Sequence, residues 1–128
     1  KLADNYITGL SNLTGFQDLK HLDLSNNELK SLNGVQNFQK ITRLSASFNW
    51  LERFPEEIQQ LKHLKSLDLT RNRLTVVPYW LTKLHALESI NLSENNLSPI
   101  SIQNAHLNLL PNLKSLNVAY QNVNPEGL

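Results

Sequence analysis

The chain has 128 residues, of which 40% are apolar, and twelve basic against eleven acidic residues give it a net charge of +1. This length suits one domain, and the apolar content is sufficient for a buried core. A nearly balanced charge creates no strong field that would attract a nucleic acid, so we expect none as a partner. The sequence holds no apolar run of the roughly 20 residues that a spanning helix needs, and we expect no membrane insertion.

One pattern, LxxLxLxxNxL, recurs five times, and its third apolar position advances in steps of 22, 23, 23 and 26 residues. A near-constant period of this length predicts a solenoid whose units pack only on their neighbours. We interpret residues 1–128 as a single domain and as an excerpt of a longer chain, because residues 1–18 match only the tail of the pattern. The complete repeats are expected to start near residues 19, 41, 64, 87 and 113.

Each copy of the pattern predicts a short strand followed by a turn. Leu22 and Leu24 are two residues apart and therefore face one side of the strand, while Asp23 faces the other. The asparagine that follows offers a donor and an acceptor to the backbone groups of the turn. A structural ladder of stacked amides is therefore expected from Asn27, Asn49, Asn72 and Asn95, whereas Gln121 at the equivalent position puts the regularity of the last turn in doubt.

These copies resemble the leucine-rich-repeat family over essentially the whole chain. The resemblance implies an α/β solenoid with a curved parallel sheet on the concave side and short helical or 3-10 returns on the convex side. The first two returns resemble phosphatase-regulator repeats, and the next two, with Pro55 and Pro78, resemble intracellular Ras-suppressor-like repeats.

The return segments carry their own start and stop signals. Pro55 and Pro78 begin rather than continue a helical turn, so a short helical or 3-10 segment is expected after each. The last return is three residues longer than its predecessors. It predicts a short helix over residues 102–109, ended by Pro111.

The sequence gives little sign of catalysis. It contains no GxxxxGK, GxGxxG or HExxH motif and no cysteine, and its four histidines do not share a repeat position. Asp23 and Asp68 do share a column of the predicted sheet, but two strand spacings separate them by roughly 10 Å, which exceeds the distances of paired glycosidase carboxylates. We therefore expect no enzyme, no metal site and no cofactor.

Candidate partner-binding residues lie on the solvent-facing strand positions and in the turns beyond them. Phe48 and Trp50 occupy turn positions that usually carry polar residues, and the next repeat places Arg71 and Arg73 beside them. Aromatic residues and arginine dominate binding hot spots, which favours a contact surface. The alternative is that an arginine over the face of Trp50 forms an internal cation–π contact. The predicted contact set is Arg43, Phe48, Trp50, Asp68, Arg71, Arg73 and Tyr120.

The sequence thus predicts a non-catalytic protein–protein interaction scaffold whose partner is another protein rather than a small molecule. The alternative is a positioning or sensing segment of a larger enzyme, receptor or secreted effector. The absence of cysteine favours a reducing compartment, and we expect a cytoplasmic location. A secreted form stays open because Asn12, Asn91 and Asn96 begin glycosylation sequons.

Overall fold

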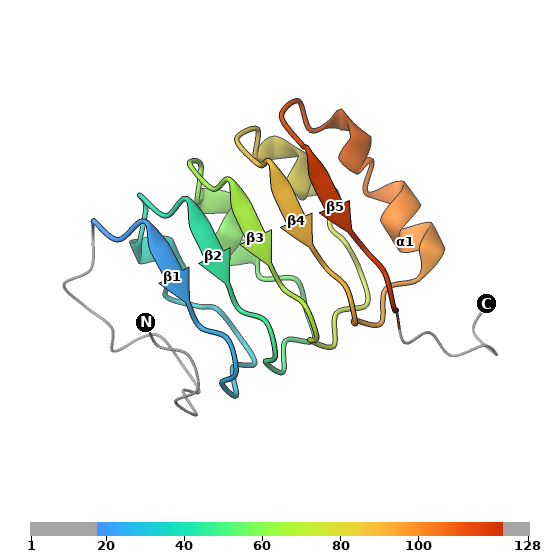
Figure 1. Ribbon diagram of the computed structural model, residues 1–128, viewed down its shortest axis with the longest axis horizontal. Helices are drawn as coiled ribbons and strands as arrows, with labels where there is room; N and C mark the ends of the chain where they lie inside the picture. The colour runs from blue at the N-terminus through green and yellow to red at the C-terminus, as the bar shows by residue number, and fades with distance from the viewer. Residues whose placement is uncertain (1–17, 122–128) are drawn as a thin grey trace.

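The computed structural model describes residues 18–121 as one parallel sheet backed by return segments (Figure 1). Its strands follow one another in chain order, each paired with the next. They are β1 (His21–Asp23), β2 (Arg43–Ser45), β3 (Ser66–Asp68), β4 (Ser89–Asn91) and β5 (Ser115–Asn117). The predicted solenoid is confirmed. The partial repeat expected before residue 19 lies outside the described residues, apart from residue 18.

The register of the sheet aligns equivalent positions of all repeats. Asp23 pairs with Ser45, Ser45 with Asp68, Asp68 with Asn91 and Asn91 with Asn117, so the predicted column is continuous. The column that begins at His21 is equally regular. Every solvent-facing strand residue therefore has a defined neighbour one strand away.

The core is a column of leucine-type side chains between the sheet and the returns. The central strand residues Leu22, Leu44, Leu67 and Ile90 are all at most 5% exposed, because alternation along a strand turns them to the covered face. The equivalent residue of β5, Leu116, is 40% exposed. The apolar column is thus covered in four repeats and open in the fifth.

The second and third complete repeats return through 3-10 helices, as their prolines predict. Pro55 and Pro78 have extended backbones immediately before η2 (Glu56–Gln60) and η3 (Tyr79–Lys83). Ile58 and Leu81 project from these helices into the core and are fully buried. A shorter element, η1 (Val35–Asn37), follows the left-handed Gly34 in the return of the first complete repeat. All three lie behind the sheet in Figure 1.

The helix predicted over residues 102–109 is wrong in its bounds. The structure instead has α1 (Pro99–Asn104) followed by η4 (Leu107–Leu109). Ser98 caps α1, its Oγ accepting from the Ser101 amide at 3.2 Å, and the proline at the first helical position suits a helix start. His106 adopts a left-handed conformation with φ of 53° and interrupts the helix, which therefore cannot run through to Leu109.

The asparagine ladder is confirmed. Asn49 Nδ2 donates to the Leu24 carbonyl of the preceding repeat at 2.9 Å and to the Ala46 carbonyl of its own repeat at 3.0 Å. Its Oδ1 accepts from the Leu29 amide at 3.0 Å. Asn49, Asn72 and Asn95 therefore each satisfy buried backbone groups on both sides of a repeat boundary.

Gln121 continues this ladder, so the doubt about the last turn was wrong. Its Oε1 accepts from the Leu97 amide at 2.9 Å, and its Nε2 donates to the Leu92 and Val118 carbonyls at 2.9 and 3.0 Å. The extra methylene is accommodated in a turn that is only half-buried.

Candidate functional site

The candidate site is built on the turns that follow the strands, which lie in a row along the lower edge of Figure 1. The third residue after each strand has a left-handed backbone, with φ between 55° and 57°. We call the surface formed by the exposed aromatic and charged side chains of these turns and of the residues just beyond them the turn rim. It comprises Lys30, Phe48, Trp50, Glu52, Arg53, Arg71, Arg73, Glu94 and Tyr120.

Backbone hydrogen bonds to both neighbouring repeats hold the turn rim in place. The Phe48 amide donates to the Thr70 carbonyl at 2.9 Å, in the next repeat. The amides of Trp50 and Arg73 donate backwards, to the carbonyls of Leu29 at 2.9 Å and Leu51 at 2.8 Å. The aromatic and cationic side chains therefore project from a fixed backbone rather than from a free loop.

Phe48 and Trp50 are each 40% exposed, as their turn positions predict. The Arg71 guanidinium carbon lies 5.2 Å from the Phe48 ring centroid. Trp50 has Arg73 at 5.8 Å and the Lys30 ammonium at 5.8 Å from its ring centroid. The internal cation–π contacts and the exposed surface that the sequence offered as alternatives are thus present together.

The cations of the turn rim are weakly neutralised. Arg71 Nε lies 3.9 Å from Glu94 Oε1, and both side chains are largely exposed, where an ion pair contributes little. Within residues 18–121, Lys30, Arg53 and Arg73 form no ion pair. An exposed pair elsewhere, Lys40 and Asp18 at 2.7 Å, lowers the pKa of the Asp18 carboxyl through its hydrogen bond and charge.

The other predicted contact residues divide between the rim and the sheet face. Tyr120 is 84% exposed and shares a hollow with Arg71 and Arg73, so the structure brings it to the rim. Arg43 and Asp68 lie instead on β2 and β3, where they line a separate shallow hollow of the sheet face. The seven predicted residues therefore form two neighbouring surfaces, not one.

Asp68 also has a structural task. Its Oδ1 accepts from the Thr70 amide at 3.0 Å and from the Thr70 hydroxyl at 2.6 Å. Asp23 binds Ser25 in the same way, at 3.0 and 2.6 Å. These hydroxyls close the turns into the rim, so the small side chains that follow the strands serve local structure as well as solubility.

The sequence prediction missed Lys30 and Arg53, which line one hollow together with Trp50 and Arg73. Both lie in the irregular start of a return, where the repeat pattern does not fix the direction of a side chain. The available signal was their position, one residue after Leu29 and two after Leu51. Residues at similar positions of adjacent repeats come together when the repeats stack.

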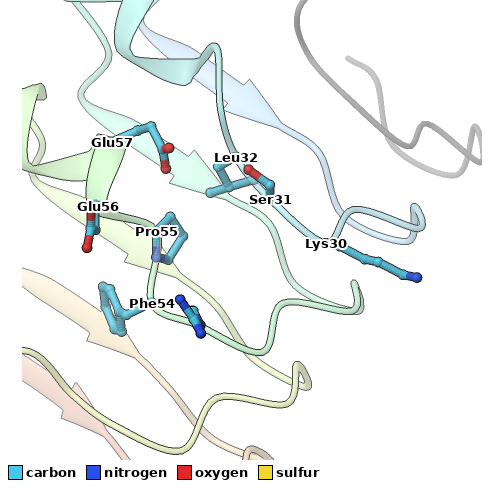
Figure 2. Close-up of a pocket in the computed structure, with 8 residues that line it drawn as sticks. Lys30, Ser31, Leu32, Phe54, Pro55, Glu56 and Glu57 are labelled. Atoms are coloured by element: carbon cyan, nitrogen blue, oxygen red, sulfur yellow. The ribbon is translucent and has the colours of Figure 1, made fainter.

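Lys30 and Arg53 also border a hollow between the returns of the first two complete repeats, shown in Figure 2. Its other walls come from Ser31 and Leu32 on one return, and from residues 54–57 on the next. Glu56 and Glu57 accompany the two cations in its lining. The charges of this hollow between the returns therefore balance, whereas the hollow beside Trp50 is lined by three cations and one carboxylate.

The described part of the chain holds neither a metal-binding cluster nor a membrane-spanning helix. Within residues 18–121, no three His, Cys, Asp or Glu side chains gather into a potential metal site. None of the helices in this part of the chain has the length and apolar content required to cross a bilayer.

Two leucine rich repeat models match the chain, over residues 18–39 and residues 54–97. The chain belongs to the leucine-rich-repeat family. Together with the stacked strands and the amide ladder, this identifies the molecule as a leucine-rich-repeat solenoid. No curated protein matches it.

Solved leucine-rich-repeat structures resemble the chain closely in fold. A leucine-rich-repeat protein of Leptospira interrogans is 34% identical with a TM-score of 0.69, over 77% of this chain and 25% of that protein. The plant peptide hormone receptor RGFR1, solved in complex with RGF2, is 27% identical with a TM-score of 0.66, over 84% and 18% of the two chains. The ectodomain of the receptor kinase SOBIR1 from Arabidopsis thaliana is 26% identical with a TM-score of 0.61, over 84% and 59%. The leucine-rich-repeat chain therefore spans less than two thirds of each.

Proposed function

We propose that this leucine-rich-repeat chain is a non-catalytic scaffold that binds a protein partner through its turn rim and the adjoining sheet face. The observation that supports it best is the pair of aromatic rings at Phe48 and Trp50, both 40% exposed on a backbone that the neighbouring repeats hold fixed. Rigid, partly exposed aromatic side chains beside arginine provide large contact area with little loss of conformational entropy on binding.

A second candidate is a positioning or sensing segment of a larger enzyme, receptor or secreted effector. It is favoured by the similar structures, since the chain matches only part of the length of each. They include the ectodomain of a receptor kinase and a receptor solved with a peptide hormone. In either case the partner contacts the repeats, and no reaction is assigned to them. A cytoplasmic location stays a prediction, since these two relatives are receptors.

The test is capture of a partner from source lysate by the immobilised intact protein, compared with a Phe48→Ala, Trp50→Ala variant. We expect the variant to weaken retention at least about tenfold, as hot-spot truncations do. The matched control is Val76→Ala, Tyr79→Ala, which removes exposed apolar groups from a return, where these residues are 60% and 57% exposed. Equal retention by the rim variant and the parent would contradict the proposal. An Arg43→Ala variant measures how much the sheet face contributes to retention of the partner.

A further inference from the structure

We infer that the turn rim takes an acidic linear segment of the protein partner, with aspartate or glutamate carboxylates set among Lys30, Arg53 and Arg73 beside Trp50. This inference rests on the proposed function and names the chemistry of the partner. It is carried by the charge and geometry of two adjoining hollows.

The first hollow has a volume of about 390 Å³ and lies against Trp50. Three cationic side chains and one carboxylate complete its lining, namely Lys30, Arg53, Arg73 and Glu52. None of these three cations forms an ion pair within residues 18–121, so a ligand carboxylate need not displace a partner carboxylate. The molecule carries a net charge of only +1, and this cluster is therefore a local excess.

The second hollow, of about 420 Å³, continues the first across the next repeats. Arg73 lines both, and the second also contains Arg71, Glu94 and Tyr120. The two hollows together follow the turns of successive repeats. A strip of this kind matches an extended segment better than a compact ligand.

Trp50 prepares its cations for carboxylates. Lys30 and Arg73 are held over the ring at 5.8 Å from its centroid, which restricts their rotamers before a ligand arrives. A guanidinium stacked on a ring keeps its N–H edge open, and that edge can donate two parallel hydrogen bonds to one carboxylate.

The carboxylates in and beside the two hollows restrict which class of partner can bind. Glu52 and Glu94 interrupt the strip, and a nearly neutral molecule lacks the extended positive field on which nucleic-acid binding depends. In the adjoining hollow on the sheet, the carboxylates of Asp23 and Asp68 outnumber the single cation Arg43, which disfavours an acidic ligand there. The acidic segment is therefore directed along the turn rim rather than into the sheet face.

The experiment is an NMR titration of the intact protein with a short peptide of alternating glutamate and serine, compared with the same peptide in which glutamine replaces glutamate. The dissociation constant is read from the indole N–H of Trp50, and the half-buried Trp80 on a return serves as an internal reference. We expect the glutamate peptide to bind at least about tenfold more tightly, and added salt to weaken it.

Matched variants locate the effect. Arg73→Gln should weaken binding of the glutamate peptide about tenfold. Lys62→Gln changes the net charge equally, but Lys62 is an exposed residue on the return of the second complete repeat, so this variant should leave the affinity unchanged. Glu94→Gln should tighten binding, because it removes a carboxylate from the strip. Equal affinity for the two peptides, or equal weakening by Arg73→Gln and Lys62→Gln, would overturn the inference. So would tighter binding of a duplex oligonucleotide or of phosphatidylserine vesicles than of the glutamate peptide.

The two proposals fail separately. Partner capture that is lost on Phe48→Ala, Trp50→Ala but unchanged by Arg53→Gln, Arg73→Gln would overturn the acidic segment and leave the scaffold function standing. Capture that is unchanged by all four substitutions would overturn both.

Discussion

At the scale of single residues, amide side chains decide whether the turns can be buried. Asn72 Nδ2 donates to the carbonyls of Ala46 and Leu69 at 3.0 and 3.1 Å, and its Oδ1 accepts from the Leu51 amide at 3.1 Å. Asn72 itself is 7% exposed, so water cannot replace these bonds easily. An unpaired buried backbone group costs considerably more than an exposed one.

Asn72→Ala is therefore expected to lower the free energy of unfolding by about 3 kcal/mol, since it strips partners from buried backbone groups on both sides of a repeat boundary. Denaturant unfolding monitored by circular dichroism measures the change. Asn33→Ala is the control, because the Asn33 side chain is exposed and bonds only the Gln36 side chain, and we expect it to cost less than about 0.5 kcal/mol. A loss at Asn72 no larger than that at Asn33 would refute the structural role of the ladder.

At the scale of elements, the returns are positioned by single polar contacts as well as by buried leucines. Ser101 in α1 accepts a hydrogen bond from the Val77 amide through its Oγ at 3.0 Å and so fastens the last return to the one before it. Val77 is 4% exposed, and its amide has no other bond among the described residues. This contact fixes the position of a helix that begins earlier than the sequence predicts.

Ser101→Ala should lower the free energy of unfolding by about 1–3 kcal/mol and speed hydrogen exchange at the Val77 amide, because that amide loses its acceptor. Native-state exchange followed by NMR tests both effects. Ser31→Ala makes the same chemical change in an exposed turn, where the Ser31 Oγ accepts from the Asn33 amide at 3.0 Å. Unaltered exchange at Val77 in the Ser101 variant would show that the contact does not hold α1.

At the scale of the whole molecule, stability is a sum over repeats and their interfaces rather than the property of one central core. The column of central strand residues makes this visible, because Leu67 is 1% exposed and its counterpart Leu116 in β5 is 40% exposed. The inner repeats have a neighbour on each side. The fifth repeat has a described neighbour on one side only, which is the fourth repeat.

The same substitution should therefore have unequal effects at equivalent positions. We expect Leu67→Ala to cost about 3 kcal/mol and Leu116→Ala less than half of that, because a truncated side chain leaves a cavity only where it was enclosed. Urea unfolding of the two variants gives the comparison directly. Equal losses would mean that β5 is covered as fully as β3.

The repeat period determined most of the fold. The strand positions, the column register and the ladder at Asn27, Asn49, Asn72 and Asn95 all follow from spacing, because a two-residue alternation and a fixed turn leave a stacked unit few alternatives. The prolines likewise predicted where η2 and η3 begin. The helix of the last return was misplaced, since Ser98 and Pro99 started it early and the left-handed His106 ended it.

Along the candidate site, the sequence predicted the exposure of Phe48 and Trp50 but missed Lys30 and Arg53. The first pair lies at fixed repeat positions, whose direction is set by the strand before them. The second pair lies in irregular returns, whose side chains are directed by contacts across a repeat boundary.

The sequence alone thus determined that the chain is a repeat solenoid, because a periodic leucine pattern can be buried only by stacking its copies. Only the tertiary structure decided which charges gather beside Trp50, because Lys30, Arg53 and Arg73 come from three successive repeats and meet only once those repeats are stacked.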